Sequence, residues 1–369
     1  MRLFPSSGGL RRRTHSPGLL ALLACGASLG AGAQPTPADL EAVQRTQQRN
    51  IREAQDRPLP QADVFVQPPP QGPRPESLPA HAGPCLPVAL LELQGHAPAL
   101  GPAPPLQQAP ACMDERALNA LLGSLNAHYQ QAGWITTRVY VDPQSAGDGV
   151  LRLRVIPGRI EDTVLAGGLP DARLPSAFPE RPDRLLNLRD LEQGLENINR
   201  LPSQQGQFTL LPGAESGSSR VEIGLQQSRR VRLTEMVDNS GTAALGRWKS
   251  TTELAVDNPS GHNDQLALGL ITNLDQGELD ARFRGLTLNY FIPKGYHLLS
   301  VSGSAIRTAF TLPGINASYP LHTRADKLGV GYDYLFARDQ ISKHSVTTGL
   351  DITRQHTTIA DVEVPSQER

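Results

Sequence analysis

Residues 237–274 decide the fold, and their sequence is VDNSGTAALGRWKSTTELAVDNPSGHNDQLALGLITNL. Two segments of alternating polarity flank a turn at Asp257–Gly261. One face carries Trp248, Ser250, Thr252, Leu254 and Val256, then Leu266, Leu268, Leu270 and Leu274. The opposite face carries Arg247, Lys249, Thr251, Glu253 and Ala255, then Gln265, Ala267, Gly269 and Asn273. Two structures fit this hairpin. A soluble antiparallel sheet would bury the first face in a core, whereas a membrane barrel would turn it to lipid and the second to a water-filled lumen.

The sequence that follows the hairpin favours the membrane barrel over a soluble β-sandwich. From Arg229 onward no helical periodicity occurs, and about seven strands of about 9–14 residues are predicted. Their expected ranges are 230–239, 246–257, 264–274, 282–293, 296–308, 325–338 and 343–355. Ordinary strands have about 5–6 residues, whereas about 9–11 are needed to cross a bilayer. In such a barrel Arg247, Lys249 and Glu253 would line the channel.

Composition restricts the class of protein. The chain has 369 residues, enough for two or three domains, and a formal net charge of −1, which does not favour binding of nucleic acid. Mean hydropathy is −0.32, and after the N-terminus no run approaches the roughly 20 apolar residues of a membrane helix. Entry into a bilayer would therefore have to use strands.

The N-terminus has the pattern of a secretory signal. Arginines precede a short apolar run, and Ala31-Gly32-Ala33 is an A-x-A cleavage site, so residues 1–33 are predicted to be a signal peptide. A membrane anchor, a lipoprotein site at Cys25 and a twin-arginine signal are the alternatives. Residues 34–57 are predicted to form a polar helix, and residues 58–84 a Pro-rich extended linker.

Two cysteines remain after the signal, Cys85 and Cys112. In an exported chain a disulfide is the default, and here it would contribute roughly 3–4 kcal/mol. Two free thiols are the alternative. Metal binding is disfavoured because no histidine lies at ligand spacing.

Two modules of α+β type are predicted before the barrel, at 85–159 and 160–228. In the first, a helix at Asp114–Gln131 precedes a hairpin of Ile135–Val141 and Val150–Val155. In the second, a helix at Leu188–Asn199, capped by Asn187, precedes another hairpin. Each is a βααββ unit, so the pattern predicts an internal repeat of about 70 residues.

The hairpins suggest a site for a partner protein. One strand of each would lie at a sheet edge with unpaired backbone groups, where an extended partner can add as a further strand. The predicted contact residues are Ile135, Thr137, Val139 and Val141 in the first module, and Gln207, Phe208, Thr209 and Leu211 in the second. The alternative is that these edges bind no partner and are either solvated or covered by the neighbouring domain.

Motifs for catalysis and cofactor binding do not occur. There is no HExxH, no G-x-S-x-G, no P-loop and no helix-opening G-x-G-x-x-G. The sequence therefore predicts no enzyme activity, no cofactor and no metal.

Several motifs together resemble the outer-membrane transporters of two-partner secretion, the haemolysin-activator and filamentous-haemagglutinin transporter type. They are AGWITTRVYVDPQ (Ala132–Gln144), RVIPGRIE (Arg154–Glu161), LNLRDLEQGLENINRLPS (Leu186–Ser203), DNSG (Asp238–Gly241), LAVDNPSGHND (Leu254–Asp264) and FIPKGYHLLSVSGS (Phe291–Ser304). The cysteine pair also matches the pattern of this family.

The resemblance implies POTRA domains in the periplasm, a transmembrane antiparallel β-barrel in the outer membrane, and residues 34–57 as a plug helix in the pore. It implies that one large secreted exoprotein, of the adhesin or haemolysin type, binds through its secretion domain and crosses the pore unfolded. Membrane lipid and lipopolysaccharide would surround the barrel. The family's complete barrel has roughly sixteen strands, so the predicted strands indicate a fragment, a split gene product or a premature stop. The alternative functions are an outer-membrane protein-assembly factor of the same superfamily, a diffusion porin, and a periplasmic binding module.

Overall fold

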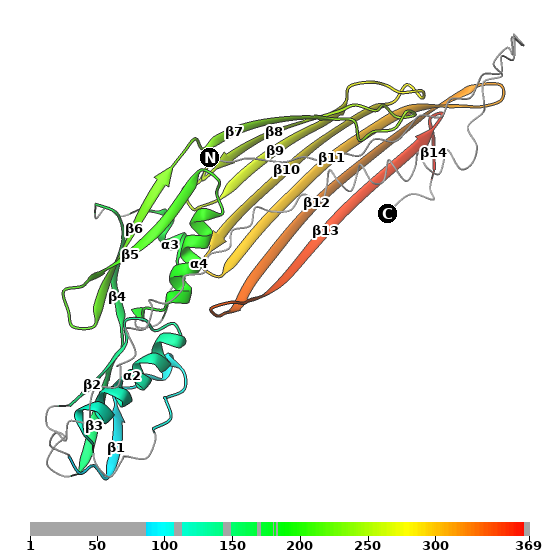
Figure 1. The fold of residues 1–369 in the computed structure, drawn as a ribbon. Coiled ribbons are helices and arrows are strands. Elements are labelled where there is room, and N and C mark those ends of the chain that lie inside the picture. The colour runs from blue at the N-terminus through cyan, green and yellow to red at the C-terminus, as the bar shows by residue number, and fades with distance from the viewer. Residues whose placement is uncertain are drawn as a thin grey trace, which may run out of the picture.

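The protein is elongated and consists of two small α/β units followed by a long curved sheet (Figure 1). The computed structural model describes residues 86–106, 113–142, 149–167, 171–179, 181 and 184–364. The predicted signal peptide, plug helix and linker lie outside the described residues, as do Cys85 and Cys112 with their predicted disulfide. Among the described helices, none is long and apolar enough to cross a membrane.

The first unit is a three-stranded sheet covered by one long helix. Its elements are β1 (Leu90–Gln94), the 3-10 helix η1 (Pro98–Leu100), α2 (Glu115–Gln131), β2 (Arg138–Val141) and β3 (Val150–Ile156). The sheet order is β1-β3-β2. Helix α2 begins where the Asp114 carboxylate accepts a hydrogen bond from the backbone N–H of Ala117.

The second unit repeats this architecture with two helices. Its elements are β4 (Arg159–Leu165), α3 (Arg173–Ala177), α4 (Leu188–Asn199), β5 (Gln204–Pro212) and β6 (Ser218–Gln227), and the sheet order is β4-β6-β5. The predicted bounds of α4 are confirmed. Its predicted cap is also confirmed, since the Asn187 side chain accepts from the backbone N–H of Arg189.

Hydrogen bonds join the two units rigidly. The Leu188 N–H donates to the Gly133 carbonyl at 2.8 Å, and the Gly158 N–H donates to the Thr137 hydroxyl at 3.1 Å. The Arg181 guanidinium lies 5.4 Å from the centre of the Trp134 ring. Gly133 has φ +89°, a conformation that other residues rarely adopt, so the joint requires glycine there.

The remaining strands form one antiparallel sheet in sequence order. They are β7 (Val231–Asp238), β8 (Lys249–Asp257), β9 (Gln265–Asn273), β10 (Arg282–Lys294), β11 (His297–Pro313), β12 (Ser318–Arg338), β13 (Lys343–Ile359) and β14 (Val362–Glu363). The seven long strands were predicted, and the eighth, of two residues, was missed. Strand β12 has 21 residues and begins seven residues before its predicted start.

The two faces of the sheet differ as the alternation predicts. The register places Leu254 opposite Leu268, and Leu268 opposite Leu288, so these leucines share one face. All three are exposed, as are Leu328 and Ile352 farther along the same row. The opposite face carries small or polar side chains such as Thr287 and Gly329, together with a buried apolar cluster that includes Phe283 and Ile306. An exposed apolar face opposite a polar one is the pattern of a barrel wall in lipid.

Two helical glycines provide a matched test of how tightly α4 is packed. A Cβ at Gly194 would meet the Phe178 ring at 2.0 Å, whereas a Cβ at Gly123 in α2 would meet nothing within 4 Å. We expect Gly194→Ala to lower the free energy of local unfolding of α4 by about 1–3 kcal/mol, because the added methyl group overpacks the contact with Phe178. Gly123→Ala should raise that of α2 by up to about 1 kcal/mol, because alanine favours helix. Amide hydrogen exchange of the two helices measures both effects, and equal responses would contradict the packing described.

Candidate functional site

Helix α4 lies against the ends of the long sheet that face the α/β units (Figure 1). Every residue from Leu188 to Ile198 is buried. The apolar side of the helix packs on its own unit, where Leu191 and Ile198 share a core with Val221 and Ile223. The other side is charged, and its burial depends on the barrel strands.

A buried cluster of charges joins α4 to the β12–β13 turn. Arg338 Nη1 lies 2.8 Å from Glu196 Oε2, and Arg338 Nε lies 3.2 Å from Glu192 Oε2. Lys343 Nζ also lies 2.8 Å from Glu196 Oε2. The side chains of Arg338 and Glu192 are 1% and 0% exposed, so neither charged group is accessible to bulk water. Together with Arg189, which pairs with Glu192, they are called the junction cluster below.

The β10–β11 turn is attached to the same helix. The Tyr296 hydroxyl donates to the Asp190 carboxylate, and Asn197 Nδ2 donates to the Gly295 carbonyl at 2.7 Å. Burial raises the pKa of Tyr296 far above its ordinary value, and the neighbouring Asp190 carboxylate raises it further. Tyr296 therefore remains a neutral hydrogen-bond donor at physiological pH.

A third turn, between β8 and β9, is the centre of the stretch that decides the fold. Asp257 is fully buried and accepts from the Ser203 N–H at 3.0 Å, Arg232 Nη1 at 2.6 Å and Gln265 Nε2 at 2.7 Å. Asn263 Nδ2 donates to the Arg173 carbonyl at 2.8 Å. Three successive turns of the sheet thus hold the second unit in one position.

The two predicted edge strands do lie at sheet edges, but they differ in accessibility. In the first unit, the outward N–H of Val139 donates to the Asn126 side chain of α2, so part of the β2 edge is occupied. Ile135 and Thr137 precede β2 rather than belonging to it. Thr137 is buried and its hydroxyl accepts from the Gly158 N–H.

The β5 edge is more open. The N–H of Gly206 donates to the Asn199 side chain, which shows that even-numbered residues of β5 direct their backbone groups away from β6. Phe208 and Leu210 have this orientation, and within the described chain no partner is recorded for their N–H groups. Gln207, Thr209 and Leu211 instead direct their backbone groups toward β6.

The three predicted pore-lining residues are not equivalent. Lys249 and Glu253 lie on the polar face of β8, as the alternation predicts. Arg247 precedes β8, and its N–H donates to Asp275 in a loop, so it does not belong to the strand wall. Lining of a pore stays a prediction for all three. Among the described residues, no group of His, Cys, Asp and Glu is placed to hold a metal ion.

Sequence comparisons identify the parts of the molecule. Residues 217–369 match the haemolysin secretion/activation protein family ShlB/FhaC/HecB. Residues 92–158 match the ShlB-type POTRA domain, and residues 159–212 match a POTRA domain. The chain therefore belongs to the ShlB/FhaC/CdiB family of outer-membrane transporters with POTRA domains, as the sequence motifs indicated.

Individual relatives agree with this assignment. Outer membrane transporter CdiB-2 of Burkholderia pseudomallei is 31% identical over 77% of this chain and 53% of its own length. Hemolysin transporter protein ShlB of Serratia marcescens is 32% identical over 73% of this chain and 48% of its own length. The solved structure of CdiB from Escherichia coli superposes with a TM-score of 0.72 at 25% identity, covering 92% of this chain and 63% of that one. The chain spans about half the length of the curated relatives it matches.

The junction cluster yields a graded prediction. Arg338→Met removes a fully buried cation and leaves Glu192 and Glu196 less well compensated, which should cost about 3–5 kcal/mol. Lys343→Met should cost less, because that side chain is 19% exposed, whereas that of Arg338 is only 1% exposed. Thermal unfolding of the detergent-solubilised chain compares the two. A larger loss from Lys343→Met would show that burial does not set the strength of the cluster.

Proposed function

We propose that this chain forms the client-receiving domains and part of the pore wall of a two-partner secretion transporter. One large exported protein is captured by the POTRA domains in the periplasm and passes through the outer membrane in extended form. No catalytic chemistry is required for this activity. The relatives named as hemolysin transporter and outer membrane transporter support the assignment.

The observation that carries the proposal is the rigid attachment of the second POTRA domain beneath the sheet. Because three turns, one of them through the junction cluster, hold the second POTRA domain, the β5 edge keeps a constant position relative to the polar face of the strands. A client bound at that edge is already next to the pore entrance and does not have to reach it by diffusion. A domain on a flexible linker would lose this advantage, since its effective concentration at the entrance would fall.

Client capture is proposed to occur by addition of a strand to β5. The client's secretion domain would form backbone hydrogen bonds with Phe208 and Leu210, whose donors and acceptors point outward. The side chains of Gln207, Thr209 and Leu211 would supply selectivity. Strand β2 is the weaker candidate, because Asn126 already occupies the Val139 N–H.

Proline substitution tests this mode of binding. Leu210→Pro removes one outward N–H and leaves the ladder with β6 intact, because the alternation set by Gly206 turns the Leu210 N–H away from β6. We expect at least a tenfold loss of affinity for the secretion domain of the exported partner, in step with reduced release of the partner into the medium. Leu210→Ala keeps the N–H and is the matched control, for which a much smaller loss is expected.

A neighbouring gene for a very large exported protein would identify the partner for this assay. Binding is measured with the full chain in detergent, and release is measured in cells that carry the complete system. If Leu210→Pro bound the secretion domain as tightly as wild type, strand addition at β5 would be rejected. If deletion of the transporter left secretion of the partner unchanged, transport itself would be rejected.

A further inference from the structure

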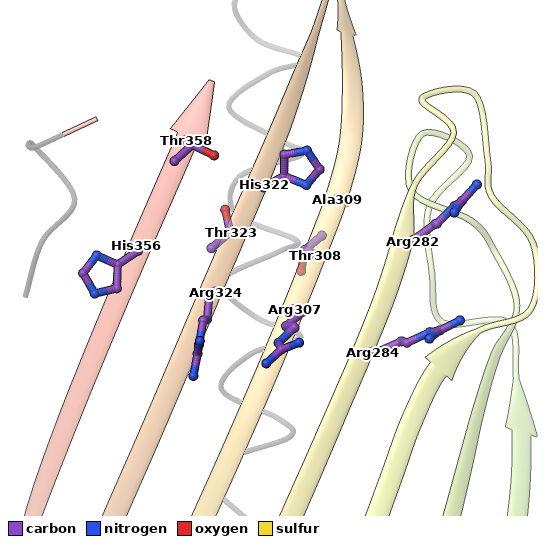
Figure 2. Close-up of a pocket in the computed structure, with 10 residues that line it drawn as sticks. All are labelled: Arg282, Arg284, Arg307, Thr308, Ala309, His322, Thr323, Arg324, His356 and Thr358. Carbon is purple, nitrogen blue, oxygen red and sulfur yellow. The ribbon is translucent and has the colours of Figure 1, made fainter. Parts of the chain in front are cut away.

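The leucine-bearing face of the sheet carries a row of basic residues near the end remote from the POTRA domains (Figure 2). Strand pairing places Arg284 opposite Arg307, and Arg307 opposite Arg324, on three adjacent strands. His356 on β13 continues the row opposite Arg324. These four residues are called the basic row. Arg282 and Arg354 lie one outward position away from it, on either side.

The position of the basic row relative to the apolar belt gives its depth in the membrane. On β12 the outward side chains from Leu328 to Phe336 are apolar and exposed, a stretch of roughly 26 Å along the strand. At a tilt of about 40° this corresponds to roughly 20 Å along the membrane normal, close to the ~25 Å apolar band of known barrels. Arg324 lies two outward positions beyond Leu328. The basic row is therefore at headgroup level, in the leaflet away from the POTRA domains.

The charges of the basic row are only partly compensated within the protein. Arg324 Nε lies 2.7 Å from Asp326 Oδ2, and His356 Nδ1 lies 3.2 Å from Glu363 Oε1. Throughout the part of the chain that the structure describes, Arg284 and Arg307 form no ion pair, and neither do Arg282 and Arg354. Like charges directly opposite each other on neighbouring strands destabilise a sheet. An external anion would remove this repulsion.

The shape of the surface also suits an anionic ligand. The basic row borders a hollow of about 440 Å³, which Arg282 and His322 also line. Small residues such as Ala309 and Thr358 keep it open between the longer side chains (Figure 2). Arginine matches phosphate particularly well, because its planar guanidinium donates two parallel hydrogen bonds to two oxygens.

We propose that the basic row binds the phosphate groups of lipopolysaccharide in the outer leaflet. This glycolipid carries phosphates at headgroup level and acyl chains directly beneath them. The same outward face offers guanidinium groups at the first level and Leu286, Leu328 and Ile352 at the second. A free anion has no acyl chains, so it would make no contact with the adjacent apolar surface. Ligand binding here is separate from client transport, and the two proposals succeed or fail independently.

Native mass spectrometry of the full chain in detergent tests the assignment with three probes. They are bis-phosphorylated lipid A, the same lipid without phosphates, and phosphatidylglycerol. Wild type should bind bis-phosphorylated lipid A at least tenfold more tightly than either of the others. This comparison uses no variant, so it does not depend on the folding of altered chains.

Variants then locate the site. Arg284→Gln, Arg307→Gln and Arg324→Gln combined should lose at least tenfold in affinity for bis-phosphorylated lipid A. The control combines Arg152→Gln, Arg154→Gln and Lys294→Gln. These remove the same charge from the first POTRA domain and from the opposite end of β10, and the control should bind like wild type. Replacement of the three row arginines by lysine keeps the charge and should bind more weakly than wild type but more tightly than the Gln variant.

Three results would overturn the proposal. Equal binding of phosphorylated and dephosphorylated lipid A would show that phosphate is not recognised. Equal binding of phosphatidylglycerol would show a general preference for anionic lipid. Equal losses in a folded row variant and in the control would place the phosphate contact elsewhere on the chain.

Discussion

The structure depends on the burial of charge between helix α4 and the turns of the sheet. Removing a carboxylate and a guanidinium from water costs several kcal/mol for each ion, and only close pairing offsets that cost. Glu192 and Arg338 are both fully buried, so either charge without its partner would strongly destabilise the folded state. The second POTRA domain and the sheet are consequently stable as a unit in one relative position. An apolar contact would tolerate sliding, whereas paired ions with fixed hydrogen bonds do not.

The same constraint explains how the sheet is oriented. The periplasmic turns face the second POTRA domain because Tyr296 and Arg338 have their partners in α4 and Asp257 accepts from the Ser203 N–H just after it. Once those turns are fixed, the period of two in the strands leaves only one choice of faces. The leucines share one face of the wall, and Lys249 and Glu253 share the other. The polarity of the wall and the position of the domain beneath it thus have a common origin.

Local patterns predicted most of the fold. The helix at Leu188–Asn199 with its Asn187 cap, the two modules and the seven long strands all follow from spacing within short windows. The charged side of α4 could not be read in this way. Its Glu and Arg residues have the pattern of a solvated face, and their partners lie more than 140 positions away in sequence. The early start of β12 was missed. This part of the strand contains Pro320, which has no N–H to donate but whose carbonyl accepts from the Ala360 N–H.

Arginine has opposite roles at the two ends of the sheet. Arg338 at the POTRA end is surrounded by acceptors from its own chain, and its charge is used entirely for internal order. Arg284 and Arg307 at the other end face each other across neighbouring strands, with no acceptor among the described residues. Sequence alternation treats all three alike, as polar residues in long strands. Only the presence of a buried counter-charge separates an arginine that builds the structure from one that is available to a ligand. The paired arginine therefore marks the fixed joint, and the unpaired ones mark the surface at which this wall meets its membrane.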